Sequence, residues 1–134
     1  MDFKDKVAVV TGGAQGIGRC IAEEFQKAGA TVCVIDKQQG NHFVGDLADK
    51  RVLEEFAKEV IEKHGHVDYL INNALPLMKG IAECSYEEFQ YALSVGVTAP
   101  FYLANEIYVT ENVWEKITVE RMNVVYAHGE RVGK

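Results

Sequence analysis

A cluster of glycines between a buried strand and an amphipathic helix is the feature that most constrains how this chain can fold. Residues 6–11, Lys-Val-Ala-Val-Val-Thr, form a short and nearly continuous apolar run, which is typical of a parallel strand buried on both faces. Apolar residues then recur at helical spacing over 17–28, and Gly29 follows as a helix stop. Because the glycines of 12–18 lie between these segments, the sequence predicts a strand, a tight turn and a helix in direct succession.

Later segments repeat this alternation of strands and helices. The predicted strands are 31–36, 42–47 and 67–72, and the predicted helices are 49–64, which Asp49 would cap, and a long one from 86 through 101 toward 107. This order indicates an α/β fold, namely a three-layer, Rossmann-like, doubly wound and mostly parallel sheet of about five strands. Only residues 37–41 separate the second and third strands, whereas a parallel crossover ordinarily takes a helix. We therefore predict a reduced second crossover, with a displaced third strand as the competing arrangement.

The tail, residues 105–134, is less regular. We expect the last helix to continue to about Arg121 and a fifth strand to follow over 123–127, ending at Gly129. Residues 117–119 and 124–126 are rich in strand-forming side chains, so a hairpin is the competing interpretation. The length of 134 residues suits one domain, and we expect a single Rossmann-like domain over 1–134.

Composition and charge exclude several classes of protein. The net charge is −6 and no run of Lys and Arg exceeds two residues, so a nucleic-acid partner is not expected. The apolar run Val7–Val10 is too short for a membrane span or a secretory signal, which favours a cytoplasmic protein without a membrane partner. We expect the three cysteines, Cys20, Cys33 and Cys84, to be reduced and mostly buried. The four histidines show no metal-ligand spacing, so no metal site is predicted.

The glycine-rich turn suits a phosphate group. Gly12, Gly16 and Gly18 can adopt backbone angles closed to other residues, and their missing side chains would let a phosphate approach the backbone. The helix that begins near Ile17 would present unpaired N–H groups and the positive end of its dipole. A tight turn without a ligand is the less favoured interpretation, because the cluster follows a buried strand and precedes an amphipathic helix. The sequence therefore predicts that residues 7–18 hold the pyrophosphate of a dinucleotide.

An acidic residue at the end of the second strand indicates which dinucleotide. Asp36 lies 18 residues beyond Gly18. A carboxylate here can accept hydrogen bonds from both hydroxyls of an adenine ribose, and it would repel a 2′-phosphate. The spacing therefore favours NAD over NADP, while Lys37, directly after Asp36, would soften the discrimination.

Three motifs within residues 1–104 together resemble the short-chain dehydrogenase/reductase family. Residues 11–18, Thr-Gly-x-x-x-Gly-x-Gly, are similar to its cofactor signature. Residues 46–47, Asp-Leu, resemble its Asp-hydrophobic pair, whose carboxylate contacts the adenine amino group, and residues 72–74 resemble its Asn-Asn-Ala-Gly. Position by position, the resemblance and the residue chemistry give this cofactor-binding set: Gly12, Gln15, Gly16, Ile17, Gly18, Asp36, Lys37, Asp46, Leu47, Asn73 and Ala74.

The chain also departs from the family pattern. Leu75 and then Pro76 follow Asn-Asn-Ala, where the family has glycine. Aligning the long helix on residues 100–101, Pro-Phe, puts Gly96 at the place of the family's catalytic asparagine. A glycine has no side chain with which to anchor the water of the family's proton relay.

The family's remaining catalytic residues are not found either. The resemblance implies a tyrosine that exchanges the substrate proton, a lysine four residues later and a serine, yet none of the six tyrosines has lysine at that spacing. The only serines, Ser85 and Ser94, precede the predicted fifth strand, and we expect the family's tyrosine to fall beyond residue 134. Tyr126 and His128 are remote acid/base candidates near the nicotinamide end of the cleft. A packed tyrosine and a solvated histidine are the preferred interpretation, so no catalytic residue is predicted.

Three hypotheses remain open from the sequence. The first is an NAD(H)-binding module that does not run the family's hydride transfer. The second is an active NAD-dependent oxidoreductase that uses non-standard residues or a partner chain. The third is an engineered or chimeric mini-Rossmann scaffold with no retained activity, suggested by the divergent tail. The resemblance also implies a homodimer, paired through the long helix, and an open sheet edge would allow a rearranged or swapped one.

Overall fold

A six-stranded sheet organises the computed structural model, which describes residues 2–108, 123–126 and 131–132. The strand order is β3-β2-β1-β4-β5-β6, and all neighbours pair in parallel except β5 and β6, which are antiparallel. The strands are β1 (Val7–Thr11), β2 (Thr31–Asp36), β3 (Phe43–Val44), β4 (Tyr69–Asn72), β5 (Asn123–Tyr126) and β6 (Arg131–Val132). The central strand β1 is buried along its whole length, as its apolar sequence predicts.

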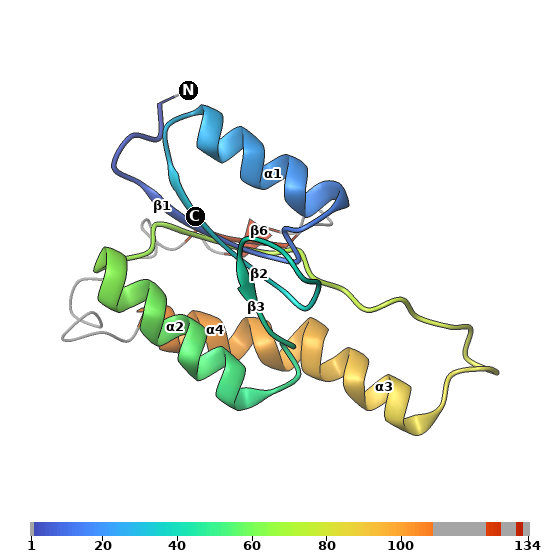
Figure 1. Ribbon diagram of the computed structural model, residues 1–134. Coiled ribbons are helices and arrows are strands. Elements are labelled where there is room, and N and C mark those ends of the chain that lie inside the picture. The colour runs from blue at the N-terminus through green and yellow to red at the C-terminus, as the bar shows by residue number, and fades with distance from the viewer. Residues whose placement is uncertain (1, 109–122, 127–130, 133–134) are drawn as a thin grey trace.

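Helices cover both faces of this sheet (Figure 1). They are α1 (Gly16–Lys27), α2 (Lys50–His64), α3 (Tyr86–Leu93) and α4 (Ala99–Tyr108), and the π-helical turn η1 (Ser94–Thr98) joins the last two. On one face Ala8, Val10 and Ile71 pack with Ala22 of α1. On the other, a larger core joins β1, β2 and β4 to α2 and α4, with Phe56 and Leu103 among its fully buried side chains. The predicted α/β class, a three-layer Rossmann-like sheet, is confirmed.

The reduced second crossover is also confirmed, although the third strand is shorter than predicted. Ile35 pairs in parallel with Phe43 and Asp36 with Val44, and no helix lies between the two strands. The predicted extent of 42–47 is wrong because the chain turns away directly after Val44. The Gly45 N–H donates to the Asp36 carbonyl at 3.0 Å, which closes the strand pair.

Other element boundaries differ from the predicted ones by a few residues or lie outside the described residues. β4 begins at Tyr69 instead of residue 67, because the Asp68 carboxylate accepts the Val7 N–H at 2.8 Å and thereby caps the strand start. β5 forms beside β4, close to its predicted range, and its antiparallel neighbour β6 was not predicted. The predicted extension of the last helix to Arg121 and the strand end at Gly129 lie outside the described residues.

The long predicted helix carries two apolar stripes, and only one of them is buried. Val95, Ala99, Leu103 and Ile107 recur every four residues and face the core. A second set is exposed, and we call it the exposed stripe: Tyr86, Phe89, Leu93, Val97 and Phe101. The pattern that predicted the helix was therefore set largely by side chains that the described fold leaves uncovered.

The prediction that the cysteines are mostly buried is wrong. Cys20 is exposed, whereas Cys33 and Cys84 are half-buried. Cys20 lies on the outer side of α1, and Cys33 lies on the part of β2 that the two-residue β3 does not cover. Partial burial raises the pKa of the Cys33 thiol.

Candidate functional site

A cavity of about 340 Å³ lies at the carboxyl ends of β1, β2 and β4. Ligands of open α/β sheets bind in the crevice at this end of the strands, where the connections diverge to opposite faces. All of the predicted cofactor-contacting residues except Gly18 line this cavity. It also has an apolar wall that the sequence did not predict as part of the site, made of Leu75, Pro76, Tyr91 and Val95.

The glycine turn forms one wall of the cavity. Gly12 and Gly16 have φ values of +67° and +58°, in the left-handed region that favours glycine. The Gly12 N–H donates to the Ile35 carbonyl at 2.8 Å, which ties the turn to the neighbouring strand β2. α1 begins at Gly16, so the unpaired N–H groups of its first turn lie at the cavity.

Gly18 does not line the cavity but lies against Gly12 and Asn73, which do. A Cβ atom at Gly18 would lie 2.3 Å from Nδ2 of Asn73 and 2.3 Å from the carbonyl oxygen of Gly12. Asn73 Nδ2 occupies this place because it donates to the carbonyl oxygens of Thr11 (3.1 Å) and Gly12 (2.9 Å). Glycine at position 18 therefore allows α1 to pack directly against the Asn73 amide, whose hydrogen bonds hold the turn in shape.

Thr11 links the glycine turn to the Asn-Asn-Ala motif of residues 72–74. Its Oγ1 accepts the N–H groups of Asn73 and Ala74, each at 3.1 Å, and donates to the Ile71 carbonyl at 3.5 Å. The end of β1 is thus bonded to the end of β4 through side chains as well as through the sheet. The sequence identified these residues as motif members without indicating that they bind one another.

Asp36 is buried, with 8% of its surface exposed, and both carboxylate oxygens bond to backbone. Oδ2 accepts the Ala14 N–H and Oδ1 accepts the Gln38 N–H, each at 3.0 Å. A carboxylate has about four lone-pair sites, so each oxygen keeps capacity to accept a further donor from the cavity. The same side chain therefore holds the glycine turn and faces the site.

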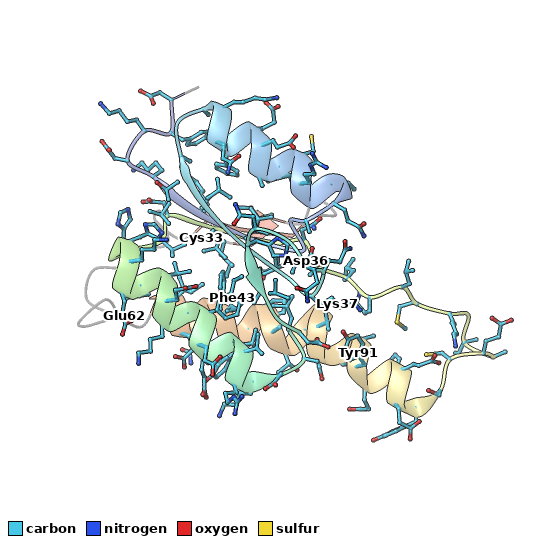
Figure 2. All side chains as sticks on the ribbon, viewed as in Figure 1. Cys33, Asp36, Lys37, Phe43, Glu62 and Tyr91 are labelled. Atoms are coloured by element: carbon cyan, nitrogen blue, oxygen red, sulfur yellow. The ribbon has the colours of Figure 1, made fainter. Side chains whose placement is uncertain are left out.

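Asp46, Lys37 and Tyr91 meet at the other end of the cavity. Asp46 Oδ1 accepts the Ala48 N–H at 2.9 Å, and the Tyr91 hydroxyl donates to Oδ1 at 3.1 Å and to Oδ2 at 3.0 Å. Lys37 Nζ lies 5.6 Å from the centroid of the Tyr91 ring. Figure 2 shows Asp36, Lys37 and Tyr91 in succession between the end of β2 and α3. Sequence reasoning missed Tyr91, whose only signal was its place four residues before Val95 in the buried stripe.

Burial raises the pKa of Tyr91, and its hydrogen bond to Asp46 raises it further, whereas Lys37 acts in the opposite direction. The phenol is therefore protonated at neutral pH and serves as a hydrogen-bond donor to the carboxylate.

Gly96 and Leu75, two positions at which the chain departs from the family pattern, lie next to one another. Gly96 lies in the π-helical turn η1, and a Cβ there would be 3.6 Å from Cδ2 of Leu75, an ordinary van der Waals contact. Leu75, at the position of the family's glycine, thus covers the place from which the family's asparagine would project. This end of the cavity wall is apolar as a result.

Of the two remote acid/base candidates, the structure describes only the backbone of Tyr126. The backbone of Tyr126 ends β5 and pairs with Asn72 of β4. His128 lies outside the described residues.

Neither a membrane-spanning helix nor a metal-binding cluster occurs in the part of the chain that the structure describes. No described helix is long and apolar enough to cross a membrane. No three of the described His, Cys, Asp or Glu side chains are grouped so that they could hold a metal ion.

Comparison with known proteins identifies the family. Residues 6–112 match the family described as short chain dehydrogenase. The chain is 36% identical over 126 residues to an uncharacterized oxidoreductase of Thermotoga maritima, covering 78% of this chain and 49% of the relative. It is 35% identical over 116 residues to the L-2,3-butanediol dehydrogenase of Corynebacterium glutamicum, covering 72% and 45%. This chain therefore belongs to the short-chain dehydrogenase family, as its motifs predicted.

A solved structure agrees with this assignment. A putative NAD(P) dependent gluconate 5-dehydrogenase from Beutenbergia cavernae, with NADP bound at low occupancy, superposes with a TM-score of 0.70 at 29% identity. The match covers 79% of this chain and 49% of that one. This chain spans about half the length of the curated relatives it matches.

The close approach at Gly18 predicts a large effect of a single methyl group. Gly18→Ala should lower the free energy of unfolding by about 2–3 kcal/mol, because the new Cβ meets backbone and a bonded amide. Gly96→Ala is the matched control in a helical turn with room for the methyl, and it should raise stability by about 0.5–1 kcal/mol. Urea unfolding followed by circular dichroism measures both; a Gly18→Ala variant as stable as the parent would contradict the packing described.

Proposed function

We propose that residues 1–134 form one dinucleotide-binding domain that holds NAD(H) and does not by itself carry out the family's hydride transfer. The observation that carries the proposal is the convergence on one cavity of the glycine turn, the N-terminus of α1 and the buried Asp36. NAD, when bound, supplies the hydride acceptor.

The residues fit the parts of a dinucleotide in order along the cavity. The pyrophosphate would lie on the turn between Gly12 and Ile17, where N–H groups are available and side chains are small. The adenine ribose would lie on Asp36. The adenine would lie toward Asp46 and Leu47, and Asn73 with Ala74 would line the cavity beside the glycine turn. Gly18 supports the turn from behind.

Preference for NAD over NADP follows from the burial of Asp36. A phosphate on the 2′ oxygen would approach a carboxylate whose charge water screens poorly and whose two oxygens are fixed by backbone N–H groups. The hydroxyls of an unmodified ribose would instead supply donors to the same oxygens. Lys37 offsets part of this repulsion, although its ammonium group lies over the Tyr91 ring, 5.6 Å from the ring centroid.

The absence of hydride transfer by this chain alone is proposed from residue identity. Gly96 stands where the family has its catalytic asparagine, and no Tyr-x-x-x-Lys occurs in the 134 residues. Relatives are about twice as long, so residues outside this sequence could supply the missing groups in a longer protein.

Binding and cofactor preference are tested together. NADH fluorescence should show saturable binding. Asp36→Ala should weaken NADH at least about tenfold while weakening NADPH far less. The N–H groups of Ala14 and Gln38 lose their acceptor whichever nucleotide is bound, whereas NADH alone loses its ribose acceptors and NADPH alone is relieved of repulsion at its 2′-phosphate. Asp68→Ala is the control, since Asp68 also accepts a backbone N–H but lies at the opposite end of the sheet.

Two results would count against this assignment. Equal weakening of both nucleotides by Asp36→Ala would show that Asp36 does not bind the ribose. No saturable binding at millimolar NADH would favour a scaffold without a retained ligand.

Turnover is tested with the same protein. We expect no oxidation of NADH above background with a panel of ketones and aldehydes, measured as absorbance at the NADH band. Activity that disappears in Tyr126→Phe or His128→Ala would overturn the inactive proposal and favour an oxidoreductase with non-standard residues.

We also propose that two copies pair through the exposed stripe. Val97 and Phe101 are 61% and 70% exposed, and the helix bearing them already buries its opposite side. A helix that is apolar on two sides ordinarily has a partner on each.

Charge on this stripe should therefore separate the copies. Val97→Glu and Phe101→Glu together should convert a dimer to a monomer in sedimentation velocity, because two carboxylates would be buried without partners. Leu77→Glu is the control, since Leu77 is fully exposed on a loop outside the stripe. A parent chain that sediments as a monomer at high concentration would contradict the pairing.

A further inference from the structure

The same three-residue arrangement occurs twice on the helices after β4. Tyr91 donates its hydroxyl to Asp46 and has Lys37 over its ring. Tyr102 likewise donates to Glu54 at 3.0 Å and has the ammonium group of Lys50 at 5.5 Å from its ring centroid. Only the first arrangement lies in the cavity, where Tyr91 and Asp46 are both lining residues.

We propose that Tyr91 is a positioning residue that holds the Asp46 carboxylate so that the site selects a purine with an amino group at its six position. This inference rests on the proposed function, because it concerns the base end of the NAD(H) site. It assigns a role to a side chain that the family motifs do not contain.

The geometry of the carboxylate supports this role. The Ala48 N–H bonds only Oδ1 and comes from the same turn as Asp46, so by itself it leaves the carboxylate free to rotate. The Tyr91 hydroxyl comes from α3, 45 residues further along the chain, and is shared between both oxygens at 3.0 and 3.1 Å. Two donors on two elements fix the plane of the carboxylate and leave lone pairs for a third donor.

Fixing the carboxylate matters because the two purine types present opposite groups. The six-amino group of adenine is a donor and can use a lone pair of Asp46. A six-oxo purine presents an acceptor at the same place, and its oxygen would face a carboxylate with no proton between them. A carboxylate that could rotate would relieve this repulsion, whereas one held by Tyr91 cannot.

The surroundings of Tyr91 keep it in place. Val95, one turn later on the buried stripe, lines the same wall and is 6% exposed. Lys37 covers the ring from the loop after β2. Tyr91 also packs against the core cluster that contains Val95, and this packing limits the movement of its ring.

The experiment compares two ligands in three proteins. Dissociation constants are measured for NADH and for reduced nicotinamide hypoxanthine dinucleotide, which differs by the six-oxo group, with the parent chain, Tyr91→Phe and Tyr102→Phe. The parent should prefer NADH, and Tyr91→Phe should reduce that preference by about fivefold, as expected for the loss of one hydrogen bond. Tyr102→Phe should leave the preference unchanged.

The outcomes separate the inference from the function on which it rests. A Tyr91→Phe variant that loses affinity equally for both dinucleotides would overturn the positioning role and show that Tyr91 only shapes the cavity. A parent chain that binds neither dinucleotide would overturn the proposed function itself, and the inference with it. Asp46→Asn provides a second variant: it should abolish the preference, and adding Tyr91→Phe to it should cause no further loss.

Discussion

The hydrogen bonds of the Asn73 amide to the carbonyls of Thr11 and Gly12 are the interaction on which the rest of the site depends. They fix the direction in which the chain leaves β1, and therefore where Gly12 and Gly16 turn and where α1 begins. They also explain why α1 needs glycine at position 18, since the helix lies directly over the Asn73 amide. Because these bonds are partly buried, each contributes about 1 kcal/mol and would cost more to leave unpaired.

Hydrogen bonds likewise fix the orientation of the two acidic side chains at the cavity, Asp36 and Asp46. Asp36 accepts N–H groups from the glycine turn and from the loop after β2, and Asp46 accepts from its own turn and from Tyr91. Each carboxylate is therefore held in one orientation before a ligand arrives. A ligand that uses the remaining lone pairs does not have to order these side chains, which is the physical basis of preorganised binding.

Much of this arrangement could be predicted from the sequence, for physical reasons that are local. A buried strand, a glycine turn and an amphipathic helix are each determined by neighbouring residues, so β1, α1 and the turn were predicted closely. The bare loop between β2 and β3 followed from its length alone. The family motifs identified the lining of the cavity because their residues are close in sequence to strand ends.

What the sequence could not predict depends on contacts between distant residues. The bond between Tyr91 and Asp46 joins positions 45 residues apart, and nothing near Tyr91 indicates it. The exposed stripe and the buried stripe are both apolar, so periodicity could not tell which one would face the core. Cys33 was expected to be buried as a reduced thiol, but the short β3 leaves part of β2 uncovered.

A crystal structure of the chain grown with NAD would show whether a dinucleotide lies across the carboxyl ends of β1, β2 and β4. We expect electron density for the pyrophosphate against the turn from Gly12 to Ile17, with the adenine ribose on Asp36. Density for the dinucleotide elsewhere, or an empty cavity in crystals grown at saturating NAD, would contradict this placement.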